Sequence, residues 1–223
     1  MLRYERQAWQ SGCTRVAGVD EVGRGPLAGP VVAAAVVIDR HFAEREEHGL
    51  LDGLVDSKQL SERRREAFFA VLADSPHVRT GIGIAEPPEI DTLNIAGATH
   101  EAMLRAVCAL RPCPDHILLD GLPVAGFACP VTAIVKGDAK SISIAAASVV
   151  GKVTRDRMMR ELDKRYPGYG LARHKGYGTT EHVRALHRLG PSPTHRRSFR
   201  PVRERAGGFP RQIELFQTES TPE

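Results

Sequence analysis

Two consecutive acids, Asp20 and Glu21, close an apolar run that begins at Val16. Two more aspartates, Asp120 and Asp138, follow the short apolar stretches at residues 117–119 and 132–135. If these strand ends share one edge of a sheet, their carboxylates would repel one another unless divalent cations lay between them. Mg²⁺ and Mn²⁺ prefer such oxygen ligands, and a pair of these ions promotes in-line hydrolysis of a phosphodiester. The four acids therefore predict a two-metal hydrolytic site.

Each aspartate alone has a simpler interpretation, because aspartates at strand ends most often form turns or cap helices. Neighbours on a regular strand also point to opposite faces of the sheet. Asp20 and Glu21 therefore reach one site only with a local distortion, and we expect the glycine-rich continuation after them to supply a bulge or a strand end. The joint occurrence of four such acids favours a shared site over four separate turns.

A glycine-rich loop follows these acids directly and contains Gly23, Arg24 and Gly25. Glycine allows a backbone to approach a ligand closely. A backbone-lined loop beside a metal centre is suited to contact a ribose 2′-hydroxyl, the group that distinguishes RNA from DNA. The alternative is a tight hairpin turn. The loop is not a dinucleotide fingerprint, because Pro26 and a valine-rich strand stand where that fingerprint requires a helix.

Charge is unevenly distributed along the 223 residues. The whole chain has 31 Lys and Arg against 27 Asp and Glu, a net charge of +4. Residues 1–151 carry a net −4, whereas residues 152–212 carry a net +11. A basic stretch of this size matches a polyanion such as a nucleic acid. A solvated, arginine-rich face is the alternative.

One aromatic residue, Tyr177, lies within a cationic and glycine-flanked part of this basic stretch. It is suited to stack on a sugar or a base while Arg173 and Lys175 bind phosphate. A tyrosine packed beneath a loop is the alternative. Four nearby histidines match no zinc-site spacing, so we expect them to be exposed or to cap helices rather than to bind metal; they are His174, His182, His187 and His195.

Composition places the chain among globular proteins, with 42% hydrophobic and 26% charged residues. Its longest apolar run, residues 31–38, is too short to cross a bilayer, and the polar start lacks the apolar region of a signal peptide. Four cysteines without a Cys-x-x-Cys pair do not indicate a disulfide scaffold or a structural zinc site. We therefore expect a cytoplasmic protein without membrane association.

Hydrophobic periodicity predicts strands at residues 16–20, 31–38, 78–84, 117–119 and 132–135, the first two forming a hairpin. It predicts helices at residues 61–72, 94–110, 141–162 and 180–189, with Ser61 and Asn94 as N-caps of the first two. This order indicates an α/β domain with a mixed sheet covered by helices. Periodicity is lost from Pro201 onward. We assign residues 1–202 to one domain and residues 203–223 to a flexible tail.

The order of several motifs resembles ribonuclease HII, the bacterial type 2 ribonuclease H. The matching segments span residues 18–30, 56–61, 120–121, 136–138, 143–148, 152–156 and 174–179. The resemblance implies an RNase H-like fold with a mixed central sheet flanked by helices and a helical C-terminal region. It also implies an endonuclease, dependent on two Mg²⁺ or Mn²⁺ ions, that cuts on the 5′ side of a ribonucleotide. Its substrates would be RNA–DNA hybrids and duplex DNA containing embedded ribonucleotides, and its products 3′-hydroxyl and 5′-phosphate ends.

Roles carried over from this resemblance fall on three groups of residues. The metal-binding and catalytic acids fall on Asp20, Glu21, Asp120 and Asp138. The ribonucleotide-sensing loop falls on Gly23, Arg24 and Gly25, and the junction-sensing aromatic falls on Tyr177. Positions near the substrate phosphates are Lys58, Ser143, Ser148 and Lys152.

Two other interpretations compete with this one. Ribonuclease HIII is related, but it carries an additional N-terminal domain, for which a first motif at Gly18 leaves no room. A nucleic-acid-binding module would keep the basic surface and treat the acids as structural. The resemblance favours the enzyme, acting as a monomer in ribonucleotide excision repair and RNA primer removal.

The C-terminal tail contains a short apolar motif at residues 212–216. It resembles the peptide with which bacterial replication proteins bind the sliding clamp. Ile213, Leu215 and Phe216 would fill a groove, and Gln212 would supply hydrogen bonds. The alternative is a frayed tail that matches the pattern by chance.

Overall fold

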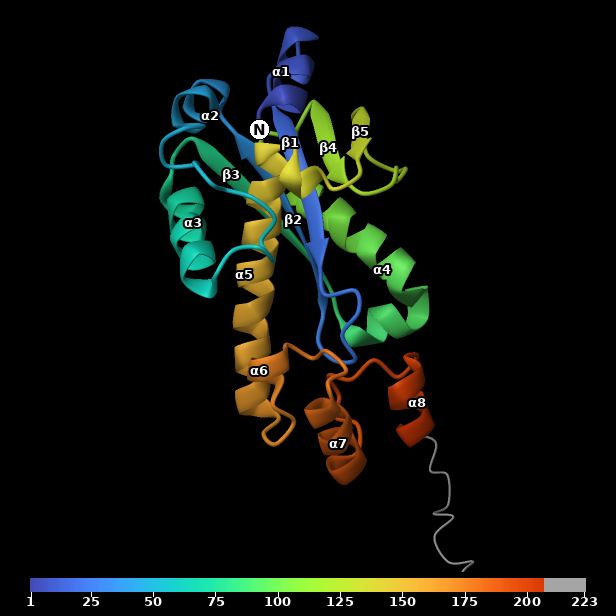
Figure 1. Cartoon of the computed structure of the whole chain (residues 1–223). Helices are drawn as coiled ribbons and strands as arrows, with labels where there is room; N and C mark the ends of the chain where they lie inside the picture. The colour runs from blue at the N-terminus through green and yellow to red at the C-terminus, as the bar shows by residue number, and fades with distance from the viewer. Residues whose placement is uncertain (207–223) are drawn as a thin grey trace, which may run out of the picture.

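The structure, a computed structural model, describes residues 1–206 and shows a five-stranded sheet covered by helices (Figure 1). The strands are β1 Val16–Val22, β2 Val31–Ile38, β3 Val78–Ala85, β4 His116–Asp120 and β5 Val131–Ile134. The helices are α1 Arg3–Gln10, α2 Arg40–Glu46, α3 Glu62–Asp74, α4 Pro87–Ala109, the short 3₁₀ helix η1 Gly137–Ala139, α5 Ile142–Arg165, α6 Leu171–His174, α7 Thr180–Leu189 and α8 Arg200–Ala206. This arrangement confirms the predicted mixed α/β architecture.

Strand β1 lies at the centre of the sheet, in the order β3-β2-β1-β4-β5. It pairs antiparallel with β2, which confirms the predicted hairpin, and parallel with β4. The β1–β4 ladder ends at the pair Val19 and Leu119. Asp20 and Asp120 come directly after that pair, so the carboxyl ends of two adjacent parallel strands bring them to the same edge. Sites in α/β sheets commonly form at this edge.

Helices α5 and α4 cover opposite faces of the sheet, which produces two separate hydrophobic cores. Because side chains alternate along a strand, Val16 packs in the core on the α5 side, whereas Ala17 and Val19 pack in the core on the α4 side. A Cβ added to Gly18 would lie 2.0 Å from the backbone carbonyl carbon of Ser143. This closeness requires glycine and sets the contact between β1 and the start of α5.

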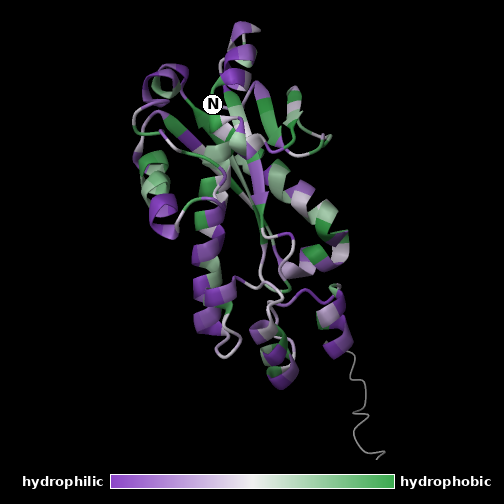
Figure 2. Cartoon of the chain, in the orientation of Figure 1, coloured by the Kyte–Doolittle hydropathy of each residue, from purple (hydrophilic) through white to green (hydrophobic). Residues whose placement is uncertain are grey.

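Hydropathy changes along α5, as Figure 2 shows. Every residue of its first segment, 142–151, is buried against the sheet, and charged residues become frequent beyond it. The sequence changes from small apolar side chains to Arg and Lys because the second half of the helix extends past the sheet toward α6 (Figure 1). The basic charge found in the sequence therefore begins where α5 leaves the sheet.

The C-terminal region is attached to the loop between β1 and β2, which we call the glycine loop (residues 23–29). An isolated bridge joins Ala28 to His195, and the amide of Gly29 donates to the carbonyl of Thr194 at 2.8 Å. On α4, Asp91 accepts hydrogen bonds from the amides of Arg197 and Ser198 at 3.0 and 2.8 Å. These contacts place the end of the basic segment beside a loop formed at the start of the chain.

Several helical features differ from the sequence prediction, and α2 and α6 are among the helices that it did not include. The polar N-terminal segment forms α1, whose Glu5 is buried and accepts hydrogen bonds from the Ser141 hydroxyl and the Ser143 amide. Helix α4 begins at Pro87, and Asn94, with φ of 58°, caps only its second part after a kink. Helix α8 continues past the predicted domain boundary at residue 202. Each was missed because its stability depends on tertiary contacts, which a local pattern does not encode.

No helix within residues 1–206 is long and apolar enough to cross a membrane.

Candidate active site

Four carboxylates gather at the edge where β1 and β4 end. Asp20 and Glu21 lie on β1, Asp120 ends β4, and Asp138 lies in η1. Burial raises the pKa of Asp20 well above its usual value, and repulsion from each of the other three carboxylates raises it further. Asp20 thus lies within electrostatic reach of the other three predicted acids. We call these four residues the acid cluster.

Asp20 is the buried member of the cluster, with 8% of its surface exposed. The Ser148 hydroxyl of α5 makes a polar contact with it, which partly opposes the rise in its pKa. Ser148 is itself hydrogen-bonded to Ser57 at 2.8 Å. The hydroxyl groups of Ser148 and Ser57 thus connect Asp20 to the loop before α3. These two contacts hold the Ser148 side chain toward the site.

Glu21 follows Asp20 in a regular strand, without the distortion that we expected. The register continues through Glu21 opposite Ala33 to Val22 opposite Val32. Asp20 therefore lies on the α5 face and Glu21 on the α4 face. Glu21 accepts a hydrogen bond from Arg24 at 3.2 Å and lines a hollow of about 390 Å³ together with Asp120. The acid cluster extends around the sheet edge instead of lying on one face.

Asp120 and Asp138 are joined through the turn that contains η1. The amide of Gly137 donates to Asp120 Oδ1 at 2.7 Å, which holds η1 against the end of β4. Burial is the main cause of the raised pKa of Asp138, followed by repulsion from Asp56 and Asp120, whereas Lys58 opposes the rise. Sequence reasoning missed Asp56 as a neighbour of the cluster, although it directly precedes Ser57 and the predicted Lys58.

The donor set fits hard divalent cations. All four side chains offer carboxylate oxygens, the ligands that Mg²⁺ and Mn²⁺ prefer. Their mutual repulsion raises the pKa of Asp20, as expected of a site that cations would stabilise. Within residues 1–206, no three His, Cys, Asp or Glu side chains form a ready-made metal-binding group. The acids are thus neighbours whose side chains must close around a bound ion.

Two fully buried arginines hold the glycine loop through its carbonyl groups, and sequence reasoning missed both. Arg196 donates to the carbonyls of Gly29, Arg24 and Gly23 at 3.0, 2.8 and 2.5 Å. Arg155 of α5 donates to the carbonyls of Pro30, Lys175 and Ala28 at 3.0, 3.0 and 3.3 Å.

Burial lowers the pKa of Arg196 to about 9 and that of Arg155 to about 10, so both stay charged at neutral pH. Gly23 has φ of 92°, and a Cβ there would meet Arg155 Nε at 2.1 Å. The glycine loop is therefore a rigid element, because the two guanidinium groups fix its peptide planes.

Tyr177 lies over this loop. Its side chain is 44% exposed, and a Cβ added to Gly25 would lie 3.6 Å from its ring. Lys58 lies near both the ring and the acid cluster: burial lowers its pKa, but Asp56, Asp20, Asp138 and Tyr177 together raise it above its usual value. The structure thus brings together the predicted acids, Gly25, Lys58 and Tyr177 around one exposed edge.

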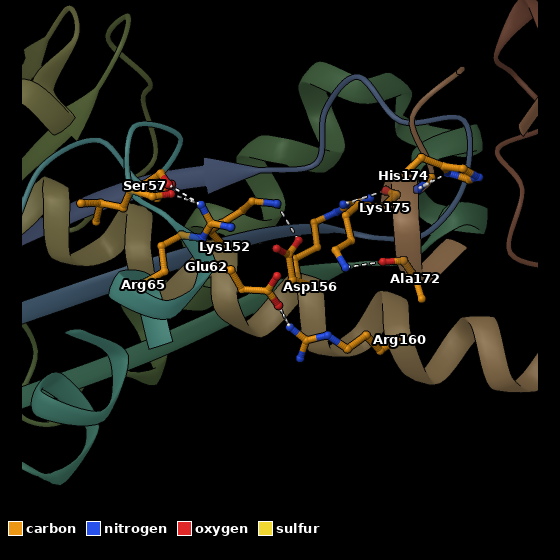
Figure 3. A network of polar contacts seen from close by, with 12 residues as sticks. Ser57, Glu62, Arg65, Lys152, Asp156, Arg160, Ala172, His174 and Lys175 are labelled. Atoms are coloured by element: carbon orange, nitrogen blue, oxygen red, sulfur yellow. Dashed lines mark hydrogen bonds and ion pairs between the residues drawn. The ribbon is translucent and has the colours of Figure 1, made fainter. Parts of the chain in front are cut away.

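Two residues predicted near substrate phosphates have other partners. Lys152 donates to Asp156 at 2.6 Å in a network along α5 that also joins Arg65 to the Ser57 carbonyl (Figure 3). Ser143 is 2% exposed and lies beneath Gly18. The structure therefore does not bring Ser143 to the surface, and Lys152 carries its charge within an ion pair.

Two larger hollows, of about 660 and 610 Å³, lie along α5 and beside α7. Neither is lined by a member of the acid cluster. The second is lined by Arg184, His187 and Arg188 and belongs to the basic C-terminal region. The volume of a hollow therefore does not identify the active site. The position of the carboxylates does.

Comparison with known proteins tests this arrangement. The family model described as ribonuclease HII matches residues 17–202. The chain belongs to the ribonuclease HII family. The matched range contains the acid cluster, the glycine loop and Tyr177. As a ribonuclease H, the chain is an endonuclease that hydrolyses RNA in RNA–DNA hybrids.

Individual relatives agree with the family. A ribonuclease HII from Geobacillus thermodenitrificans is 53% identical over 207 residues, which cover 93% of this chain and 76% of that protein. The crystal structure of ribonuclease H2 from Pyrococcus horikoshii OT3 is 31% identical, has a TM-score of 0.70, and covers 85% of this chain and 96% of its own.

Two more distant structures share the fold. Ribonuclease HII in a complex with PCNA from Archaeoglobus fulgidus is 27% identical with a TM-score of 0.63, covering 77% of this chain and 86% of its own. Bst ribonuclease HIII in complex with Mn²⁺ is 20% identical with a TM-score of 0.69, and the match covers 90% of this chain and 71% of that chain. The last comparison supports the fold alone.

Proposed function

We propose that this ribonuclease HII hydrolyses the phosphodiester on the 5′ side of a ribonucleotide, in RNA–DNA hybrids and in duplex DNA with embedded ribonucleotides. The products are 3′-hydroxyl and 5′-phosphate ends. The observation that carries this proposal is the placement of the acid cluster beside Tyr177 and the exposed part of the glycine loop, Arg24 and Gly25. That geometry joins a hydrolytic centre to groups suited to recognise a ribose.

The acid cluster would hold two Mg²⁺ or Mn²⁺ ions. Such ions activate a water and stabilise the leaving oxygen of an in-line displacement. Asp20 and Asp120 extend from adjacent strand ends, and Glu21 approaches from the other face of the sheet. Lys58 places a positive charge near both the cluster and Tyr177, where it is suited to contact a substrate phosphate.

The protein's own groups supply the selectivity for ribose. Arg196 binds the carbonyls of Gly23 and Arg24, so the N–H groups of the same two peptide units, those of Arg24 and Gly25, point away from it. These amides are suited to contact a 2′-hydroxyl. Tyr177, held over Gly25, is suited to stack against the sugar of the next nucleotide.

A duplex with a single ribonucleotide tests the function and separates it from a simple binding module. With Mg²⁺ or Mn²⁺ we expect chelator-sensitive cleavage on the 5′ side of the ribonucleotide, with 3′ ends that a polymerase extends. Asp138→Asn is expected to bind the duplex without cutting it. Tight binding by the wild type without cleavage would contradict the proposal.

We also propose that the motif at Gln212, Leu215 and Phe216 binds the sliding clamp, which would direct the enzyme to ribonucleotide excision repair and primer removal. The motif lies outside residues 1–206. The support is its sequence and the PCNA complex of the Archaeoglobus relative. Deletion of residues 212–223 is expected to abolish clamp pull-down and to leave cleavage of short duplexes unchanged; retained pull-down would contradict the assignment.

A further inference from the structure

His174, His182 and His195 form a cluster beside the segment that carries Tyr177. This cluster is unexpected, because we predicted these histidines to be exposed or to cap helices. The His174 and His182 rings stack with centroids 4.4 Å apart, and the His182 and His195 rings are 5.2 Å apart. His182 and His195 are buried, with 0% and 2% exposure. Nothing in the reaction requires imidazoles at this place, so their hydrogen bonds indicate what they do.

The hydrogen-bond partners determine which ring nitrogen of His195 and of His182 carries the proton. The backbone N–H of Ser192 can only donate, so His195 Nδ1 accepts from it at 3.0 Å. A neutral His195 then carries its proton on Nε2, which donates to His182 Nε2 at 3.1 Å. His182 must therefore carry its own proton on Nδ1, which donates to the Tyr177 carbonyl at 3.0 Å.

His182 and His195 are both neutral at physiological pH, because burial lowers the pKa of His182 and lowers that of His195 to about 4. A protonated imidazole at either position would place two N–H donors against each other or against the Ser192 amide. We call this directed series, from Ser192 through His195 and His182 to Tyr177, the imidazole relay.

The relay ends at the residue that carries the exposed aromatic ring. The Tyr177 carbonyl also accepts from the Thr179 amide at 2.8 Å, so two donors fix the peptide that follows the ring. On the other side, the Gly176 amide donates to His174 Nδ1 at 3.2 Å, and the Gly176 carbonyl accepts from Leu27 of the glycine loop at 2.8 Å. Imidazoles therefore hold the backbone on both sides of Tyr177.

This attachment matters because both neighbours of Tyr177 are glycines. Gly176 has φ of 82°, and the backbone at Gly176 and Gly178 is intrinsically permissive. Without fixed carbonyl and amide directions, the Cα–Cβ bond of Tyr177 would not be held toward Gly25. The relay supplies the rigidity that the local sequence lacks.

We propose that His182 and His195 are positioning residues that orient Tyr177 over the glycine loop and thereby set the preference for a ribonucleotide–DNA junction over a continuous RNA–DNA hybrid. This inference rests on the proposed function, because it assigns the Tyr177 ring to the junction. Cleavage within continuous hybrid depends on the acid cluster, which the relay does not contact.

Two substitutions of His182 separate the two ends of the relay. In His182→Asn, the side-chain amide lies near the former Nδ1 and keeps a donor for the Tyr177 carbonyl. In His182→Gln, the amide lies near the former Nε2 and keeps a partner for His195 only. Each variant retains one of the two contacts, so they form a matched pair. His187→Gln, at an exposed position on the same helix, is the control.

The measurement is the ratio of cleavage rates on a single-ribonucleotide duplex and on a continuous hybrid. Loss of one hydrogen bond of ordinary strength corresponds to a change of about tenfold. We expect His182→Gln to lower the ratio by about that factor, and His182→Asn and His187→Gln to change it less than about threefold. In a Tyr177→Ala background, His182→Gln is expected to cause no further loss.

Equal losses in the Asn and Gln variants, or a further loss in the Tyr177→Ala background, would overturn the proposal. If the His182 variants do not fold, ¹⁵N spectra of the wild type at neutral pH decide: we expect His182 protonated on Nδ1 and His195 on Nε2, and the opposite tautomers would refute the relay. A wild type that cuts neither substrate would refute the proposed function, while the tautomers would still test the relay.

Discussion

Replacement of Arg196 by lysine tests whether buried cations hold the glycine loop. Arg196 supplies three hydrogen bonds to loop carbonyls, whereas a single ammonium group at the same site is expected to reach one. Two buried carbonyls then lose their donors, at about 1–3 kcal/mol each. Lysine keeps the positive charge, so the repulsion between this position and Arg155 remains and does not offset the loss. We expect a decrease of about 3 kcal/mol in the free energy of unfolding.

A loss of this size leaves a folded protein, because domains of this kind have about 5–15 kcal/mol of stability. For a chain of this length it corresponds to a decrease in Tm of roughly 6–12 °C. Urea unfolding and thermal melting measure the change, and Arg197→Lys is the control because Arg197 is adjacent and exposed.

The function should change with the stability. With the Gly23 and Arg24 carbonyls released, cleavage beside a single ribonucleotide should decrease more than DNA binding. If Arg196→Lys melts within about 1 °C of Arg197→Lys, the guanidinium contacts do not hold the loop, and this explanation of its rigidity is wrong.

Three further predictions concern other parts of the molecule. His195 stays neutral in the native state down to about pH 4, whereas its ordinary pKa is 6.5, so the unfolded chain binds more protons between these values. Stability should therefore fall as the pH decreases from 6.5 to 4, by up to about 3 kcal/mol from this group, and urea unfolding of His195→Gln should lack that contribution. Asp138→Asn removes a carboxylate that repels Asp56 and Asp120; we expect a higher Tm than wild type in EDTA together with loss of cleavage, and a lower Tm in EDTA would contradict the assigned repulsion. Glu5→Ala removes the acceptor for the Ser141 hydroxyl and the Ser143 amide at the start of α5; a loss of about 2 kcal/mol is expected, and an unchanged melting curve would show that α1 does not stabilise this helix.

Local patterns predicted the elements that bring the acids together. Valine-rich runs on either side of the glycine loop predicted the hairpin of β1 and β2, and apolar runs ending in Asp120 and before Asp138 predicted two of the strand ends. These signals succeed because a strand buried on both faces of a sheet forms a short, continuous apolar run in the sequence. The parallel pairing of β1 with β4, which brings Asp20 and Asp120 to one edge, is a tertiary feature that the sequence allowed but did not determine.

The same patterns did not reveal the buried polar framework. Arg155 and Arg196 look like members of a solvated basic segment, yet both bind carbonyls distant in sequence. Likewise, His182 and His195 bind each other only because α7 and the segment after it fold back beneath Tyr177. Such partners are set by tertiary structure, and no periodicity along one segment encodes them. Of the two expected distortions at the glycine-rich continuation, the bulge is absent, because pairing with β2 continues through Val22, where the strand ends.

The attachment of Arg196 to the glycine loop has a consequence for synthesis of the protein. A chain grows from its N-terminus on the ribosome, and its early segments emerge first. Residues 23–29 are made near the beginning, but the side chain that fixes their carbonyls arrives more than 160 residues later. The nascent polypeptide therefore carries all four acids well before Arg196 can fix the glycine loop, so the ribose selectivity that we propose for this loop requires almost complete translation.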